Sequence, residues 1–287
     1  MLALTNLRRA AHLTVLAALG SAAALGAALG IEACGGTETG GRRIVLDTRV
    51  ALAADGSAFG TAAGWDVTLT RAVVSTGAFY YFDGAPPVVA FAPESSRQLA
   101  PESSRRLVLG LLGLGEAQAH PGHYHTGDAL GQMLEPWSVD LLAGPATLPA
   151  GDGVTGTYRS ARFSFGSPPA GPLAGELGAH AALVEGVAAR AEALVRFRAV
   201  ADLADIARSA AEGNVDGCEF DELDVEGSGV VTLTVHPKAW FDLVDFAALT
   251  PSGADAPVEF SPGSQPQVAF AQGLAQLSAY EFSFSTP

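Results

Sequence analysis

Glycine and proline are spread along the whole of this 287-residue chain, and their spacing most constrains its fold. There are 34 glycines and 17 prolines, and many short apolar runs lie between them. Short apolar runs bounded by turn residues are typical of an all-β sandwich or barrel. Hydrophobic residues make up 48% of the chain and charged residues 16%, which is enough to build a sizeable core. We therefore expect a β-sandwich of short antiparallel strands with one or two short helices.

The clearest strand pattern lies at 229–235, where β-branched residues dominate. Residues 157–165 alternate between apolar and polar types with a period close to two. The segment 176–212 fits both a helical spacing and strand alternation, and we expect strands over 180–201 and a short helix over 203–211. Further strands are expected at 43–52, 65–74, 78–82, 138–142 and 279–284, and a short helix at about 129–134.

The N-terminal segment has the pattern of an export signal. Arg8 and Arg9 precede an uncharged run, 13–31, rich in alanine, leucine and glycine. The run is also about long enough to span a bilayer, but its low hydrophobicity and the basic residues on both sides favour export. The signal is predicted to cover residues 1–33.

Residues 31–34 resemble a bacterial lipobox, in which the cysteine receives the lipid. Cys34 would then be the lipidated first residue of the mature protein, although Glu32 departs from the pattern and leaves ordinary signal cleavage as an alternative. Residues 34–42 would form a flexible tether, followed by a single β-sandwich domain over 43–287. This arrangement predicts a lipoprotein of the bacterial cell envelope, in the periplasm or at the outer membrane.

Cysteine content and charge narrow the classes of function. The chain has two cysteines, and if Cys34 carries lipid then Cys218 is expected to be a buried, small hydrophobic residue rather than a copper ligand. Lysine and arginine total 16 against 30 acidic residues. An acidic protein of this kind is not expected to bind nucleic acid, which requires basic patches.

A loop inserted at about 92–135 contains the most specific chemical signal in the sequence. An eight-residue unit at 92–99 recurs at 100–107, and the histidines follow it. His120, His123 and His125 fall within six residues, and imidazole is a common ligand for copper and zinc. The Pro-Gly step between the first two histidines bends the backbone, so the imidazoles could converge on one ion. The alternative is a solvated loop that is rich in histidine without binding metal.

Two further histidines are candidates for additional ligands. His180 precedes an apolar strand pattern, and His236 follows the run 229–235. Residues at strand ends are well placed to project into a shared site. The alternative is that each is an isolated polar residue at a sheet edge.

The remaining motifs do not predict catalysis. The acidic run at 216–226 fails as a calcium loop because Leu223 occupies the position that requires glutamate, so we expect a solvated acidic loop. The sequence has no Gly-x-Ser-x-Gly elbow, no His-Glu-x-x-His motif, no phosphate loop and no dinucleotide fingerprint. We therefore do not expect an enzyme.

Several segments resemble periplasmic copper-binding proteins of the MbnP type, the methanobactin-partner-like proteins. The resemblance lies in the lipoprotein-like start and in residues 65–70, 158–165, 180–186 and 231–246. It implies an all-β domain that binds one copper ion through histidines, with His180 as the matching ligand position.

These observations predict an exported, lipid-anchored protein that binds a transition metal, copper before zinc, for sequestration or delivery. Its partners would be the metal ion, the membrane through the lipid anchor, and an envelope protein that exchanges the metal. One alternative is a structural or interaction lipoprotein without metal. A weaker alternative is a metal-dependent hydrolase or oxidase, in which the ion keeps an open position.

Overall fold

The computed structural model describes residues 41–87, 125–249 and 256–286, and strands dominate these ranges. The strands are β1 (Arg43–Leu52), β2 (Ala58–Gly60), β3 (Asp66–Phe82), β4 (Ala129–Met133), β5 (Trp137–Asp140), β6 (Ala146–Val154), β7 (Gly156–Phe165), β8 (Ala182–Arg190), β9 (Ala193–Ala201), β10 (Asn214–Val225), β11 (Gly229–Val235), β12 (Val258–Glu259) and β13 (Tyr280–Ser285). The α-helices are α2 (Ala174–Leu177), α3 (Leu203–Ile206), α4 (Lys238–Phe241) and α5 (Gln265–Leu274). Single 3-10 turns lie at Leu141–Ala143, Ala211–Gly213, Phe246–Ala248 and Leu277–Ala279.

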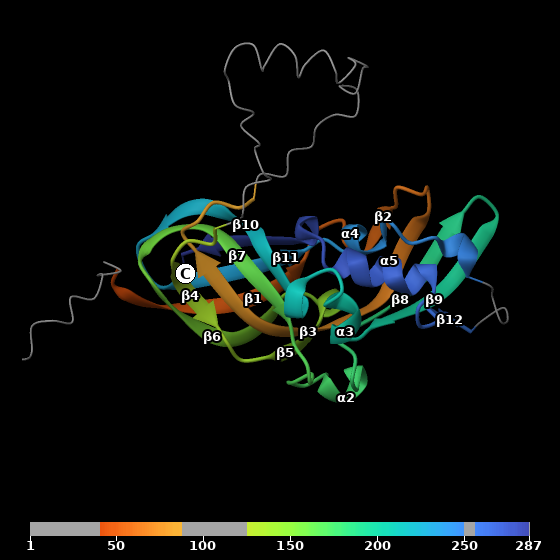
Figure 1. Cartoon of the computed structure of the whole chain (residues 1–287), viewed down its shortest axis with the longest axis horizontal. Coiled ribbons are helices and arrows are strands. Elements are labelled where there is room, and N and C mark those ends of the chain that lie inside the picture. The colour runs from red at the N-terminus through yellow and green to blue at the C-terminus, as the bar shows by residue number, and fades with distance from the viewer. Residues whose placement is uncertain (1–40, 88–124, 250–255, 287) are drawn as a thin grey trace, which may run out of the picture. The chain divides into compact units, whose positions relative to one another are not determined.

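All thirteen strands of the described ranges belong to one sheet, which closes on itself. Its order is β12-β9-β8-β3-β4-β6-β1-β11-β13-β10-β7, with β2 and β5 attached to β3. Because β7, the last strand of this path, also pairs with β3, the strands from β3 round to β7 form a closed unit (Figure 1). Strand β3 is 17 residues long and continues beyond the closed unit to pair with β8 and β2. It therefore joins the closed unit to an open extension of the sheet.

The predicted all-β fold class is confirmed, and several strands fall where the sequence places them. Strands β1 and β11 coincide with the predicted runs 43–52 and 229–235, and β8 and β9 resolve the ambiguous segment in favour of strands. Most pairings are antiparallel, but β1–β11, β10–β13 and β9–β12 are parallel. The two strands of each parallel pair are connected through other elements of the chain. A short hairpin can join only antiparallel neighbours.

Two local predictions are wrong. Residues 129–133 form strand β4 rather than a helix, because their backbone pairs with β3 and β6. The acidic run lies largely on strand β10 rather than in a loop. Val215, Phe220 and Val225 are buried, and acidic side chains such as Asp221 and Asp224 face solvent. Alternation of this kind is the usual pattern of a half-buried strand.

Aromatic side chains fill the closed unit. Phe79, Tyr81, Phe163, Phe220 and Phe282 are each at most 2% exposed. Neighbouring rings among them have centroids 5.6–6.3 Å apart, within the range of favourable aromatic pairs.

Glycines let this core approach the wall of the sheet closely. A Cβ atom on Gly153 would lie 2.7 Å from both the Cδ1 atom of Leu46 and the hydroxyl oxygen of Tyr158. Gly131 pairs with Gly153 on the neighbouring strand, and a Cβ there would lie 3.0 Å from the same leucine atom. Side chains at these two positions would displace the core residues behind them.

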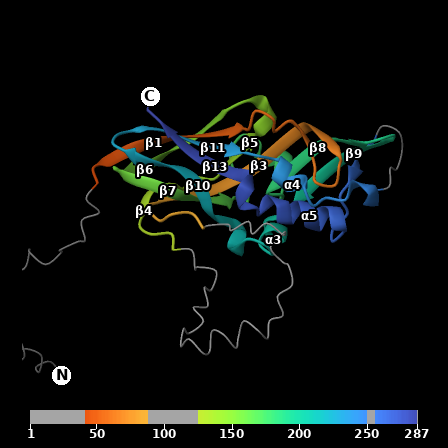
Figure 2. The same cartoon turned by 90° about the horizontal axis from the view of Figure 1, so that it is seen from above.

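The helices α4 and α5 lie against the open extension of the sheet (Figures 1 and 2). A second aromatic group is buried there, in which Phe197 of β9 contacts Phe241 of α4, and Phe241 stacks on Phe270 of α5. The sequence does not predict α5. Its start carries helix signals, with the Ser264 side chain as cap and Pro266 in the first turn. Among the described helices, none is long and apolar enough to cross a bilayer.

Cys218 is fully buried in the core, as predicted for a small hydrophobic residue. Burial raises the pKa of its thiol to about 12. The predicted export signal, Cys34 and most of the tether lie outside the described residues, as does most of the inserted loop.

Candidate functional site

The described part of the histidine segment begins at His125, which is exposed; His120 and His123 lie outside the described residues. The backbone after His125 is fixed to the end of β3. The amide of Gly84 donates to the carbonyl of Thr126 at 3.0 Å, and the Asp83 carboxylate accepts from the amide of Asp128 at 2.7 Å. His125 therefore stands at a defined place, beside the point where β3 ends and β4 begins.

His180 contacts a carboxylate that caps a helix. Its Nδ1 atom lies 2.6 Å from an Asp202 carboxylate oxygen. Asp202 is the N-cap residue of α3 and forms a capping box with Asp205. This interaction ties the start of β8 to the start of α3.

His236 also faces a carboxylate, in a different part of the sheet. Its Nε2 atom lies 3.3 Å from a Glu281 carboxylate oxygen, and its backbone amide donates to the Ala279 carbonyl at 2.9 Å. Both contacts link the end of β11 to the start of β13. Among the described residues, neither His180 nor His236 shares its carboxylate with another histidine.

The strand register separates these histidines. We call the end of the closed unit at which β1 begins the Arg43 end, and the opposite end the Val235 end. His125 lies at the Arg43 end, because β4 pairs with β6 where β6 runs beside the start of β1. His236 lies at the Val235 end, where Val235 pairs with Leu52 at the end of β1.

His180 is distant from His125 as well. The carbonyl of Ala181 accepts from the amide of Ser75, seven residues before the end of β3 at Phe82. At the rise of an extended strand, these seven residues span roughly 23 Å. The structure does not bring His125, His180 and His236 together. In the ranges it describes, no three His, Cys, Asp or Glu side chains are grouped so as to hold a metal ion.

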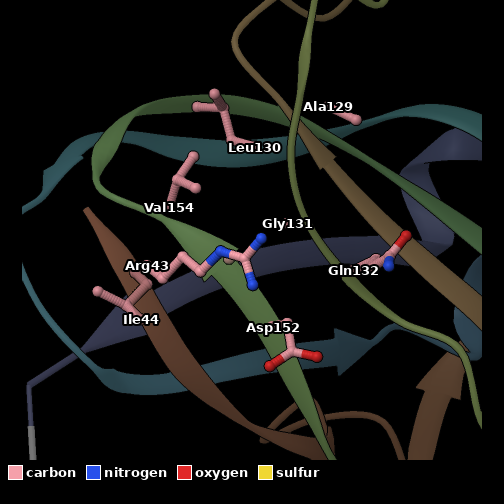
Figure 3. A pocket seen from close by; sticks show the side chains of 9 residues that line it. Arg43, Ile44, Ala129, Leu130, Gly131, Gln132, Asp152 and Val154 are labelled. Atoms are coloured by element: carbon pink, nitrogen blue, oxygen red, sulfur yellow. The ribbon is translucent and has the colours of Figure 1, made fainter. Parts of the chain in front are cut away.

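A pocket of about 420 Å³ also lies at the Arg43 end, close to His125 in the chain (Figure 3). It is formed by β1, β4 and β6, and its lining residues are Arg43, Ile44, Ala129, Leu130, Gly131, Gln132, Asp152, Gly153 and Val154. The side chains of Gln132 and Asp152 lie on paired positions of neighbouring strands and are exposed. Sequence reasoning did not identify this pocket, because its three strands are far apart in the chain.

Tyr158 supports this pocket from the interior. Its hydroxyl lies 3.1 Å from the carbonyl oxygen of Leu130 and 2.9 Å from that of Val154, both pocket residues. Burial raises the pKa of Tyr158 to about 12. The hydroxyl is therefore protonated at neutral pH and donates to these carbonyls.

A second hollow of about 390 Å³ lies nearby and is lined by Arg42, Thr155, Gly156, Asp224, Val225 and Glu226. Its polar groups bond mostly to one another. The Arg42 guanidinium donates to the Glu226 carbonyl at 2.8 Å, and the Thr157 hydroxyl donates to the Asp224 carboxylate. This hollow offers fewer free polar groups to a ligand than the pocket at Arg43.

The strongest electrostatic cluster is structural. Arg71 of β3 donates to Glu176 of α2 and to Asp140 at the end of β5. Hydrogen bonding to Glu176 raises the pKa of Arg71, and hydrogen bonding from Arg71 lowers the pKa of Glu176. Both carboxylates bond to the one Arg71 guanidinium, so the cluster holds α2 against the sheet.

Comparison of the chain with protein-family models, with curated proteins and with solved structures gives no match. The resemblance to MbnP-type proteins therefore stays a prediction.

Proposed function

We propose that this protein is an exported, lipid-anchored protein of the bacterial cell envelope that binds one copper ion through His120, His123 and His125. Its role is to sequester or deliver the metal rather than to catalyse a reaction. The observation that carries the proposal is the presence of three imidazoles within six residues, a ligand set that suits copper and, after it, zinc.

The surroundings of His125 support this role. Its side chain is exposed, so a metal ion can reach it without opening the core. The Asp83–Asp128 contact fixes the backbone just beyond it, which lowers the entropy lost when the imidazole is held by an ion. An exposed ligand set also suits exchange of the ion with a partner protein.

His180 and His236 take a different role in this proposal. Each already faces a carboxylate, and the register places them away from His125. We assign them to the packing of α3 and of β13. They therefore provide a control, because replacing both removes two imidazole groups from the surface without touching the proposed site.

The test is a measurement of bound metal. The full chain, expressed in a bacterial host without a histidine tag, is loaded with copper or zinc, desalted and analysed by elemental mass spectrometry. We expect about one copper per chain, since three imidazoles hold one ion. The triple variant with alanine at His120, His123 and His125 should lose it, and the His180→Ala/His236→Ala variant should keep it.

Two results would overturn the proposal. One is full copper content in the triple variant. The other is the absence of copper from the loaded wild-type chain, together with a thermal midpoint that no metal changes, since a metal that binds the folded state must raise its stability. The second result would favour the structural or interaction lipoprotein.

A further inference from the structure

The pocket at Arg43 presents polar side chains that have no partners in the protein. Across the described ranges, neither hydrogen bonds nor ion pairs engage the side chains of Arg43, Gln132 and Asp152. Figure 3 shows Arg43 reaching from β1 across β6 toward Gly131, with Gln132 and Asp152 on neighbouring strands. A cation, an amide and an anion therefore border one open space.

The two opposite charges at this pocket lie on adjacent strands but do not pair with each other. Asp152 is two residues from Val154, the partner of Arg43 on β6, so the two charges are diagonal neighbours about 7–8 Å apart at their backbones. Opposite charges on other neighbouring strands do pair, as Arg198 does with Glu185 at 2.8 Å and Arg162 with Asp216. Arg43 and Asp152 remain separate, with the pocket at their side.

We propose that this pocket binds a small zwitterion, an aliphatic amino acid or a short peptide. The ligand's carboxylate binds the Arg43 guanidinium, which can donate two parallel hydrogen bonds to it. Its ammonium group takes the Asp152 carboxylate, and the Gln132 amide can bond to either end. This site is independent of the proposed copper ligands.

The remaining lining sets the size and character of the ligand. Leu130 and Val154 are half-buried at the pocket and offer apolar contact to an aliphatic side chain. A volume of about 420 Å³ is at the lower end of the roughly 300–1,000 Å³ typical of small-molecule sites. A large ligand would not be enclosed. A simple anion would be repelled by the Asp152 carboxylate and could not bond to it.

The experiment uses three probes that share the leucine side chain and differ in charge. L-Leucine carries both charges, L-leucinamide lacks the carboxylate and N-acetyl-L-leucine lacks the ammonium group. Binding to the full chain is measured by titration calorimetry in the presence of a metal chelator, so the result does not depend on the copper proposal. We expect L-leucine to bind and each of the other probes to bind at least about tenfold more weakly, since each loses a charge-assisted hydrogen bond.

Variants locate the site. Arg43→Ala should weaken L-leucine binding about tenfold or more and leave leucinamide binding unchanged. Asp152→Asn should also weaken L-leucine binding about tenfold or more, and it should leave N-acetyl-L-leucine binding unchanged. Arg49→Ala and Asp47→Asn remove the same charges from exposed positions of β1 outside the pocket and should have no effect.

The assignment is overturned by any of three results. These are no heat of binding with any probe at millimolar concentration, equal binding of all three probes, or undiminished L-leucine binding in the Arg43 variant. Tighter binding of inorganic phosphate than of L-leucine would also overturn it, because the site would then be an anion site only.

Discussion

Removing either of two buried tyrosine hydroxyls in the core should change the free energy of unfolding, and the two changes should have opposite signs. Tyr158 and Tyr81 pack together, with ring centroids 6.2 Å apart, and both are fully buried. The Tyr158 hydroxyl reaches the carbonyls of Leu130 and Val154, whereas the Tyr81 hydroxyl lacks a hydrogen bond of good geometry. The Thr48 hydroxyl lies beside the Tyr81 hydroxyl and favours its ionised form as a hydrogen-bond donor would, but the contact does not reach the geometry of a hydrogen bond, and neither hydroxyl has another partner among the described residues.

The size of each change in the free energy of unfolding follows from the hydrogen bonding and desolvation of the hydroxyl that is removed. A hydroxyl has one proton, so Tyr158→Phe removes one hydrogen bond and leaves a carbonyl less satisfied, which lowers the free energy of unfolding by about 1–2 kcal/mol. Tyr81→Phe removes a buried, unbonded hydroxyl whose desolvation costs about 1–3 kcal/mol. Because the variant also removes the contact between the Tyr81 and Thr48 hydroxyls, we expect a net gain near 1 kcal/mol rather than the full amount.

The assay is equilibrium denaturation of the full-length protein and its phenylalanine variants, with the thermal midpoint as a second readout. For a domain of this size, each kcal/mol corresponds to about 2–4 °C. Tyr158→Phe should therefore melt lower than the wild type, and Tyr81→Phe the same or higher. Tyr80→Phe, at a half-exposed position of the same strand as Tyr81, is the control and should change stability by less than about 0.5 kcal/mol.

One result would refute the reasoning. If Tyr81→Phe destabilises the protein as much as Tyr158→Phe does, the Tyr81 hydroxyl forms a hydrogen bond in solution. The double variant separates the two cases, because independent effects should add to near zero while a shared network would give a larger loss.

Three further predictions concern a glycine, the buried thiol and a carboxylate. Gly153→Ala should lower the free energy of unfolding by about 1–3 kcal/mol through overpacking, measured by denaturation. Gly175→Ala, whose Cβ would meet no atom within 4 Å, should not destabilise the protein. Cys218 should resist thiol reagents in the native protein at about pH 8–9 and react on unfolding, since its folded pKa of about 12 exceeds the unfolded value. For the same reason, the contribution of the protonated thiol to the free energy of unfolding is lost as the pH rises above about 8.5. The bond from Arg71 lowers the folded pKa of Glu176, so its contribution is present above about pH 4.3 and lost as the pH falls; Glu176→Gln should abolish that part of the acid dependence, and an unchanged pH profile would contradict it.

The sequence alone determined what depends on local pattern. The β-branched run at 229–235 and the alternating run at 43–52 are strands with the predicted bounds, because alternation records which side chains face the core. The burial of Cys218 followed from its chemistry. The three clustered histidines were likewise visible as a ligand type before any geometry was known.

Pairing between distant segments was decided only by the tertiary structure. Residues 129–133 contain no β-branched or aromatic residue and so do not specify a strand locally, and they form one because β3 and β6 lie on either side. Closure of the sheet depends on the contact between β3 and β7, which no local pattern records.

The candidate sites divide in the same way. Sequence proximity grouped His120, His123 and His125, but only the strand register places His125 and His236 at opposite ends of the closed unit. The pocket at Arg43 is invisible in the sequence because β1, β4 and β6 each contribute one part of it. Local sequence fixes which residues can form a strand or bind a ligand, whereas the hydrogen-bond register between strands fixes which of those residues meet.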